Sequence, residues 1–291
     1  MEEKMKVIAI DLDGTLLSKE GVISGENKKA IKEAQRKGHV VSICTGRDID
    51  DVRRLLQMAD LDCPIIAGNG AIVSVDGAIV NSTPLIHGEA LEILHQIEKQ
   101  EIFYHVYTNE GIFAPKNGEK SVAVELDIFK SANPEADEEE LKNVAKMYLH
   151  QFGLNTIDSA AALKSESLEF FKILPFSYQT KKMEDLRKSL LKNPNLAVTS
   201  SADHNLEINH IDATKGNGLA QLANHFNIPM KDTVAIGDNL NDVSMLKTAG
   251  LAIAMGNALD EIKELAHQTT LTNDEDGVAF ALRKYVITEN E

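Results

Sequence analysis

The sequence predicts an α/β protein with a parallel-sheet core and a second α/β domain inserted into that core. Short β-branched runs alternate with helical patterns in the first third of the chain, and the same alternation returns in the last third. The middle third has a different texture, with an aromatic strand and a helix that begins in acidic residues. With 291 residues, the chain is long enough for two domains that each bury a core.

The first third reads as a β-α-β-α-β series. We expect strands at residues 6–10, 40–43 and 64–67, with helices at 24–38 and 48–59 between them. The strands lack a polar face, as is typical of strands that are covered on both sides. The series therefore predicts a Rossmann-like parallel sheet with helices on its faces.

The last third repeats this pattern, and its strands also end in polar residues. We expect helices at 218–226, 243–249 and 259–266, with strands at 233–236 and 251–254. Four polar residues follow predicted strands directly or within two positions: Asp11, Thr45, Asn69 and Asp238. Because ligands bind at the carboxyl ends of strands in open parallel sheets, these residues define a candidate site.

The inserted domain is expected to span residues 84–210, which leaves 1–83 and 211–291 for the core. Its predicted helices lie at 88–99, 135–152 and 181–192. An aromatic strand is expected at 102–107, and the ranges 195–200 and 205–209 read as a strand pair. The range 167–174 alternates imperfectly, which predicts a strand in a half-exposed sheet.

Composition excludes several classes of function. The formal net charge of −15 opposes binding to nucleic acid and to anionic membrane surfaces. An acidic protein that acts on an anionic substrate must gather positive charge locally, which usually means a metal ion with Lys or Arg. The short N-terminal apolar run does not suit a signal peptide, no segment reaches spanning length, and the two cysteines form no disulfide framework. We therefore expect a cytoplasmic protein, and no protein partner is inferable.

The first candidate motif begins with Asp11 and Asp13. Side chains two positions apart on an extended chain share a face, so both carboxylates could enter one site, where a divalent cation would offset their repulsion. One carboxylate could then act as a nucleophile while the other exchanges a proton. The alternative is an ordinary polar turn. A calcium loop does not fit, because its twelfth position is Val22 rather than Glu.

The second motif, Thr45-Gly46-Arg47, ends the second predicted strand. A threonine hydroxyl and backbone N–H groups near a glycine suit phosphate oxygens, although a structural turn explains the same residues. The adjacent Cys44 is read as a packed thiol, since no neighbouring residue in the sequence would generate a thiolate.

Two further motifs lie in the last third. Lys215-Gly216 stands just before a predicted helix, where an ammonium group could meet a bound phosphate; the alternative is a surface lysine. The loop 237–242 carries carboxylates and amides that suit octahedral Mg²⁺. A helix N-cap at Asp238 or Asn239 is the alternative, and the two roles can coexist.

Together these motifs resemble the haloacid dehalogenase superfamily of phosphatases, and more closely its Cof-like sugar-phosphatase branch. The four superfamily motifs are Asp11-x-Asp13-Gly14-Thr15, Thr45-Gly46-Arg47, Lys215-Gly216 and Gly237-Asp238-x-x-Asn241-Asp242. The branch also has Asn-Gly-Ala after the third strand, as at Asn69-Gly70-Ala71, and a large α/β cap inserted before the motif lysine.

The resemblance implies a role for each motif residue. Asp11 would attack phosphorus and form an aspartyl-phosphate, and Asp13 would protonate the leaving group and then activate water. The implied phosphate-binding residues are Thr45, Gly46, Lys215 and Asn241, with Arg47 and Asn69 as further substrate or cap contacts. The implied Mg²⁺ ligands are Asp11, the backbone carbonyl of Asp13, Asp238 and Asp242, the last either directly or through a neighbouring group.

The expected function is therefore Mg²⁺-dependent hydrolysis of a small phosphorylated metabolite, above all a sugar phosphate. The alternatives are a phosphomutase or phosphotransferase, and a non-catalytic phosphometabolite sensor. A receiver-type regulator is opposed by the second acid at Asp13 and by the long insertion. Polar candidates for substrate selection in the inserted domain are Tyr104, His105, Tyr107, Glu169 and Lys172, each of which could equally be a strand-surface residue. His210 and Asp212 lie near the expected hinge and could be part of a linker.

Overall fold

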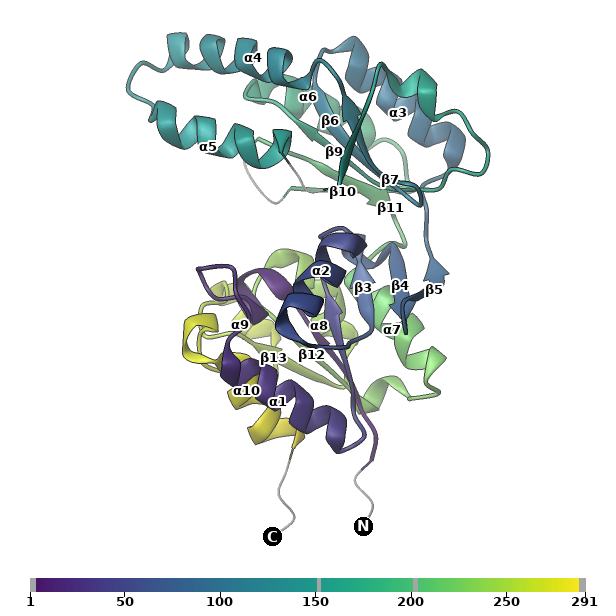
Figure 1. Cartoon of the computed structure of the whole chain (residues 1–291), viewed down its shortest axis with the longest axis vertical. Helices are drawn as coiled ribbons and strands as arrows, with labels where there is room; N and C mark the ends of the chain where they lie inside the picture. Colours follow the sequence, from purple (N-terminus) through teal and green to yellow (C-terminus); the bar gives the residue numbers. More distant parts are fainter. Residues whose placement is uncertain (1–3, 151–152, 201–203, 288–291) are drawn as a thin grey trace. The chain divides into compact units, whose positions relative to one another are not determined.

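The structure, a computed structural model, describes residues 4–150, 153–200 and 204–287. These residues form two compact units (Figure 1). Unit 1 comprises the described residues up to Ser82 and from Ala213 onward, and unit 2 comprises those of Thr83–Asp212. The boundaries predicted from the sequence follow residues 83 and 210.

The sheet of unit 1 is parallel over most of its width. From β14 through β3 the strands are parallel, and β4 and β5 then add an antiparallel hairpin. Among the described residues its order is β14 (Gln268–Thr269), β13 (Leu251–Ala254), β12 (Thr233–Gly237), β1 (Val7–Ile10), β2 (Val40–Cys44), β3 (Ile65–Ala67), β4 (Ile72–Val75) and β5 (Ala78–Ser82). The predicted parallel α/β core is thereby confirmed.

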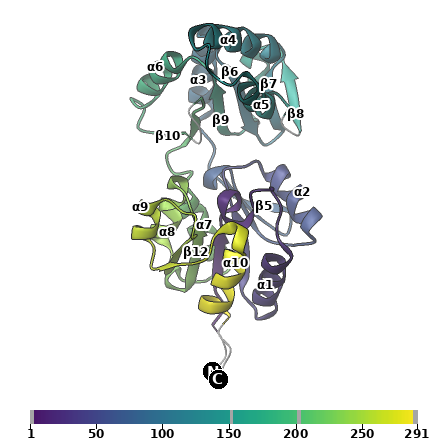
Figure 2. The ribbon, with the colours of Figure 1, turned by 90° about the vertical axis from the view of Figure 1, so that its left-hand side faces the viewer.

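Helices cover both faces of this sheet, which explains why every residue of β1 is buried. The helix α7 packs along β1 to β4 and beside α8, whereas α1 packs against β2 and α10 (Figure 2). Ser24 and Asp48 begin α1 and α2 as N-caps, each accepting a backbone N–H of the first turn. The helices are α1 (Gly25–Arg36), α2 (Ile49–Ala59), α7 (Lys215–His225), α8 (Val243–Thr248), α9 (Asp260–Leu265) and α10 (Gly277–Ala281).

In unit 1, the hairpin of β4 and β5, as well as β14 and α10, was not predicted. The hairpin turns at Asp76 and Gly77, which both have positive φ (50° and 79°). Asp-Gly between β-branched runs is a recognised signal for a two-residue hairpin turn, so this part of the fold was readable from the sequence.

Unit 2 has a mixed sheet with its own helices. Neighbouring strands are antiparallel except for β7 and β8, which are parallel. Among the described residues the order is β10 (Leu196–Thr199), β11 (Glu207–His210), β9 (Phe170–Phe176), β6 (Phe103–Thr108), β7 (Gly111–Pro115) and β8 (Leu154–Ile157). The helices are α3 (His87–Lys99), α4 (Gly118–Ala132), α5 (Glu138–Leu149) and α6 (Thr180–Leu190). The predicted α5 positions 151 and 152 lie outside the described residues.

The expectation of a half-exposed strand at 167–174 is wrong, because every residue of β9 is buried. The central strands contribute to two apolar clusters. Tyr104 and Val106 of β6 join a cluster with α3 and α6, whereas Phe103 joins one with α4 and α5. Alternate residues of a strand face opposite sides, so cover on both sides buries the strand completely. None of the helices in the described part of the chain combines the length and the apolar character that a bilayer crossing needs.

Candidate active site

Three strands of unit 1 end together and deliver polar residues to one edge of the sheet. Asp11 follows β1, Thr45 follows β2 and Asp238 follows β12. The N–H of Asp11 donates to the Ile236 carbonyl oxygen of the neighbouring strand (2.9 Å), which extends the parallel pairing up to Asp11. The sheet register therefore fixes the backbone on which the first acidic residue stands.

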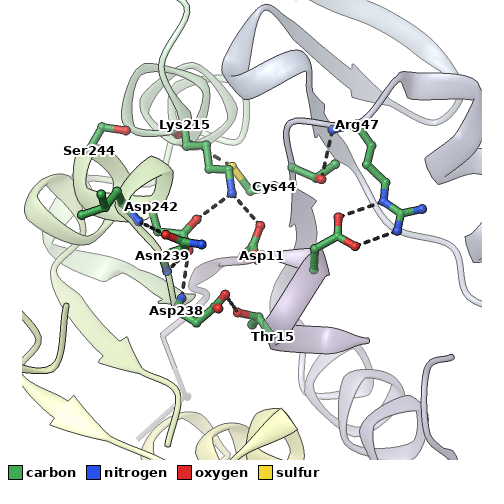
Figure 3. Close-up of polar contacts among 12 residues, drawn as sticks. Asp11, Thr15, Cys44, Arg47, Lys215, Asp238, Asn239, Asp242 and Ser244 are labelled. Carbon is green, nitrogen blue, oxygen red and sulfur yellow. Dashed lines mark hydrogen bonds and ion pairs between the residues drawn. The ribbon is translucent and has the colours of Figure 1, made fainter. Parts of the chain in front are cut away.

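Lys215 is the centre of the buried charges (Figure 3). Its Nζ donates to Asp11 Oδ1 (2.5 Å) and to Asp242 Oδ1 (2.6 Å). The lysine opens α7 itself rather than standing before the helix, and the hydroxyl of the N-cap Thr214 accepts the Asn217 N–H (3.1 Å). Burial alone would lower the pKa of Lys215, but the two aspartates outweigh burial and hold the pKa above its usual 10.5.

Asp242 organises the loop after β12. Its side chain is fully buried, and Oδ2 accepts the backbone N–H groups of Asp238 (2.9 Å) and Asn239 (3.1 Å) while Oδ1 accepts from Lys215. Asp238 in turn accepts the hydroxyl hydrogen of Thr15 on Oδ1 (2.9 Å). Thus the first and last thirds of the chain are joined at this loop, and the half-buried carboxylate of Asp238 has a fixed place beside Asp11.

The donor set fits a divalent cation. Asp11, Asp238 and Asp242 each offer an oxygen atom, and these atoms lie within 4.8 Å of one another. Three carboxylates face one lysine, so the cluster carries an excess of negative charge. Burial, and after it the charge of Asp242, raises the pKa of Asp11 well above 3.8; burial likewise raises the pKa of Asp238. A hard cation with oxygen ligands, such as Mg²⁺, would balance this charge.

Cys44 lies next to this cluster but is a packed thiol. It is the last residue of β2, it is buried, and its Sγ lies 3.9 Å from the carbonyl oxygen of Lys215. Burial raises the pKa of this thiol although Lys215 opposes the shift, so the thiolate is disfavoured.

The Thr45 loop forms a second wall beside the cluster. The Thr45 N–H donates to Ile66 O (2.8 Å), and its carbonyl oxygen accepts the Asn69 N–H (2.9 Å). A Cβ on Gly46 would come 2.8 Å from Asn69 Oδ1, so this glycine permits the close approach of the two loops. Gly70 has a φ of +99°, and a Cβ there would overlap the Thr214 carbonyl oxygen at the start of α7. The Asn69-Gly70 turn therefore packs directly against the helix that carries Lys215.

The structure places Asp13 and Asp11 with different partners. The Arg47 guanidinium holds the Asp13 carboxylate in a fork, Nε to Oδ2 at 2.8 Å and Nη2 to Oδ1 at 2.6 Å, whereas Asp11 bonds to Lys215. Extended chain is expected through Asp11 and Asp13, but a tight turn, Leu12–Leu16, begins directly after Asp11. In this turn Gly14 has a φ of +78°, and its missing side chain leaves room for the Asp238 carboxylate.

Of the predicted phosphate-binding residues, Asn241 lies at the surface beside the cluster. Asn241 is exposed on the short turn Leu240–Asp242. Two further residues form hydrogen bonds at the site but were not singled out as site residues from the sequence. Thr15 supplies the hydroxyl bonded to Asp238, and Ser244 Oγ accepts the Gly216 N–H (3.0 Å) at the start of α7. Thr15 is part of the first motif and could have been found; Ser244 carries no signal beyond its place after the acidic loop.

Among the candidates in unit 2, the aromatic residues of β6 are buried rather than strand-surface residues. Tyr104 belongs to the α3 side, where its hydroxyl donates to Glu98 Oε1 (2.8 Å). His105 and Tyr107 alternate with it, and their rings lie 6.4 Å apart. The unit-2 sheet thus presents these candidates on opposite faces.

Lys172 and Glu169 behave differently from each other. Lys172 is buried, with Nζ 4.4 Å from the Tyr107 ring centroid and 3.9 Å from Glu207 Oε2. Glu169 is exposed, and its backbone N–H donates to Asn109 Oδ1 (2.9 Å).

His210 and Asp212 remain near the boundary between the two units. His210 ends β11, and its Nδ1 accepts the Asp212 N–H at 3.2 Å. This local turn is consistent with the linker reading.

The chain is similar to known proteins over nearly its whole length. The family model of haloacid dehalogenase-like hydrolases matches residues 8–282. The chain is 41% identical over 282 residues to the phosphatase YwpJ of Bacillus subtilis, covering 96% of this chain and 99% of the relative. It is 43% identical over 277 residues to the 5-amino-6-(5-phospho-D-ribitylamino)uracil phosphatase YwtE of the same organism, covering 95% and 96%. A solved haloacid dehalogenase-like hydrolase from B. subtilis superposes with a TM-score of 0.82 at 40% identity, covering 97% of this chain and all of that one.

Proposed function

The chain belongs to the haloacid dehalogenase-like hydrolases and is a phosphatase, and we propose that it hydrolyses small sugar-phosphate-type metabolites with Mg²⁺ as cofactor and Asp11 as nucleophile. One observation carries the proposal: a buried lysine bridges Asp11 to a second aspartate inside an otherwise unbalanced carboxylate cluster. Such a cluster is costly unless it binds a cation and a substrate that use it.

Two hydrogen bonds of Asp11 support its proposed role as the nucleophile. Its backbone is fixed by β1 and its Oδ1 by Lys215, so the carboxylate has one orientation. In the proposed reaction a carboxylate oxygen of Asp11 bonds to phosphorus as the bond from phosphorus to the leaving oxygen breaks. Water then cleaves the aspartyl-phosphate, which releases inorganic phosphate and restores Asp11.

Lys215 and the cation are both proposed to neutralise negative charge on the carboxylates and the phosphate. Asp11 and Asp238 would hold Mg²⁺, with the Asp13 backbone carbonyl as the third protein ligand. When bound, the ion would stabilise negative charge on the phosphate oxygens. Both oxygens of Asp242 already accept hydrogen bonds from the protein, so we assign it to orienting Lys215 and the loop rather than to direct ligation.

Phosphate is proposed to bind between the Thr45 loop and Lys215. The Thr45 side chain and the Gly46 N–H stand at the end of β2, and Asn241 lies on the acidic loop. Phosphoryl transfer depends mainly on positioning and on charge stabilisation, which these groups would provide.

Asp13 is proposed as the proton donor to the leaving oxygen and then as the base for water. An alkoxide leaves poorly unless it receives a proton, so this step matters most for metabolites with an alkyl leaving group. Asp13 is exposed enough to exchange its proton with solvent, since 57% of its side chain is accessible.

The name of one relative supports the proposed substrate class. The name of YwtE specifies a substrate with a phosphorylated ribityl chain, which is a sugar-alcohol phosphate monoester. A phosphorylated polyol and a sugar phosphate present the same primary phosphate ester to Asp11. We therefore include both in the substrate class.

A screen of phosphorylated metabolites with Mg²⁺ tests the proposal. Hexose phosphates, ribitol 5-phosphate and p-nitrophenyl phosphate would be assayed on the wild type, on Asp11→Asn, and on Asp62→Asn as an exposed control. We expect Asp11→Asn to lose about 10⁴-fold or more in turnover, because both the nucleophile and its charge are removed. Wild-type turnover in Asp11→Asn would refute the nucleophile, and activity that is unchanged in excess chelator would refute the metal.

A further inference from the structure

Arg47 holds acidic residues on both sides of its guanidinium group. Nε and Nη2 donate to the two oxygens of Asp13, as described above, and Nη1 donates to Asp51 Oδ2 (2.8 Å) on α2. Arg47 and Asp51 are four residues apart, so the helix start sets this second contact. The arginine therefore has one partner close to it in sequence and one on a separate loop.

The backbone of Arg47 is fixed at the proposed phosphate pocket. Its N–H donates to Thr45 Oγ1 (3.2 Å), and its carbonyl oxygen accepts the Gly68 N–H (3.0 Å). The Arg47 backbone is thus held by two hydrogen bonds, so a change of position would involve the methylene groups and the guanidinium. A phosphate bound at Thr45 would lie within reach of this side chain.

The contact between Arg47 and Asp13 conflicts with the proton transfer proposed for Asp13. Both carboxylate oxygens of Asp13 accept N–H groups of Arg47, so neither is available to a leaving oxygen until at least one of these bonds opens. A guanidinium fork binds phosphate oxygens with the same two-point geometry as a carboxylate. The two anions can therefore compete for one donor face.

We propose that Arg47 is a partner-exchange residue: it holds Asp13 in the free enzyme and transfers its fork to the substrate phosphate, which releases Asp13 for proton transfer. The inference rests on the proposed function for the position of the phosphate. In this exchange, binding of the substrate phosphate to Arg47 also frees the Asp13 carboxylate for proton transfer. Asp51 keeps Arg47 in place during the exchange.

The exposure of the two side chains makes the exchange feasible. Asp13 is 57% exposed and Arg47 34%, and ion pairs at this level of exposure are weak. Their bond therefore lowers the apparent affinity for phosphate by only about two- to fivefold. Asp51, at 21% exposure, is the less solvated partner and is the contact that we expect to persist.

A double-mutant cycle on the binding of inorganic phosphate tests the proposal. Isothermal titration calorimetry in the presence of Mg²⁺ would compare the wild type, Asp13→Asn, Arg47→Ala and the double variant. We expect Arg47→Ala to weaken phosphate binding about tenfold or more, through loss of charge-assisted hydrogen bonds. Asp13→Asn should tighten phosphate binding about two- to fivefold, because the internal competitor is gone.

The double variant separates competition from simple charge repulsion. If Asp13 competes through Arg47, then Asp13→Asn should change phosphate affinity by less than about 1.5-fold in the Arg47→Ala background. A gain that persists there would overturn the proposal, as would unchanged phosphate affinity in Arg47→Ala. Arg53→Ala, which removes a surface ion pair with Asp50 on the same helix, is the matched control.

Two further measurements keep the result interpretable. Arg47→Lys retains the charge without the fork and should fall between the wild type and Arg47→Ala, which guards against a general folding defect in the alanine variant. The proposed function can fail independently: if no phosphate ester is turned over while the binding cycle holds, the exchange stands and the catalytic assignment falls. If Asp11→Asn abolishes turnover while the cycle shows no coupling, the exchange alone is refuted.

Discussion

The two units bury charge in opposite ways. In unit 1, three carboxylates surround one lysine, so the cluster keeps an excess of negative charge. In unit 2, the buried Glu125 of α4 is fully matched by donors. Its carboxylate accepts from Ser177 Oγ (2.6 Å), the Tyr178 N–H (3.0 Å), Gln179 Nε2 (3.3 Å) and Lys182 Nζ (3.1 Å).

This difference is the one expected between a reactive site, as proposed for unit 1, and a structural one. Glu125 ties α4 to the start of α6, and within the described part of the chain the hydrogen-bond partners of its carboxylate come from the segment between Ser177 and Lys182. It therefore needs nothing from outside the protein. The unit-1 cluster has an excess of negative charge. A bound cation would balance this charge and could then bind a phosphate ester. Three substitutions test this contrast.

Lys215→Met should have the largest effect. The substitution keeps the length of the side chain but removes the only cation within the described cluster, so kcat/KM should fall about 10³-fold. Steady-state kinetics would measure the loss, with the exposed Lys247→Met on α8 as the control. A loss of less than tenfold would mean that Lys215 only balances charge in the folded protein and does not serve the reaction.

Glu125→Ala should affect stability but not chemistry. Loss of the carboxylate leaves several donors at the start of α6 without their acceptor, which should cost about 3 kcal/mol of unfolding free energy. Urea denaturation would measure the loss, with Glu119→Ala in the exposed first turn of α4 as the control. The folded variant should keep kcat on p-nitrophenyl phosphate within about twofold of the wild type. A larger drop would mean that the balanced cluster also serves catalysis.

Asp238→Asn should change the stability of the metal-free protein less than Glu125→Ala does, and in the opposite direction, by stabilising it. The pKa of Asp238 is raised above 3.8, so its ionised form destabilises the fold; this cost is absent below about pH 3.8 and complete above the raised value. Because the carboxylate is partly solvated, the gain at pH 7 should be about 1 kcal/mol or less, or roughly 2–4 °C in Tm.

Thermal unfolding in chelator at pH 7 and near pH 4 would test this sign. The difference between the variant and the wild type should shrink at the lower pH, and stabilisation of the wild type by added Mg²⁺ should be lost in the variant. A lower Tm for Asp238→Asn at pH 7 in chelator would show that the cluster is already balanced without a cation.

Regular strand and helix patterns made most of unit 1 predictable. The apolar strands and their N-capped helices follow directly from residue type, as at Ser24 and Asp48. Unit 2 was harder because its pattern is mixed. In α4, Val122 and Leu126 are buried, but Val124 and Ile128 are exposed, so the apolar stripe that marks an amphipathic helix is blurred. For β9, cover on both faces cannot be read from one strand alone.

The members of the site were predictable, but their pairing was not. Strand ends brought Asp11 and Asp238 to one edge, as the parallel-sheet rule requires. The contact of Asp13 with Arg47 joins residues 34 positions apart and depends on the tight turn after Asp11. The local sequence does not specify whether Asp13 pairs with Arg47 or with Lys215. The fully buried state of Asp242 likewise follows from tertiary packing and not from its spacing.

The position of β1 has a consequence for synthesis of the protein on the ribosome. Ile10 pairs with Ile43 on one side and with Ile236 on the other, so one edge of this central strand stays open until the last third of the chain has been made. Unit 2 is contiguous and is translated in the meantime. It can therefore fold first, while the open edge of β1 stays exposed to pairing with a wrong strand.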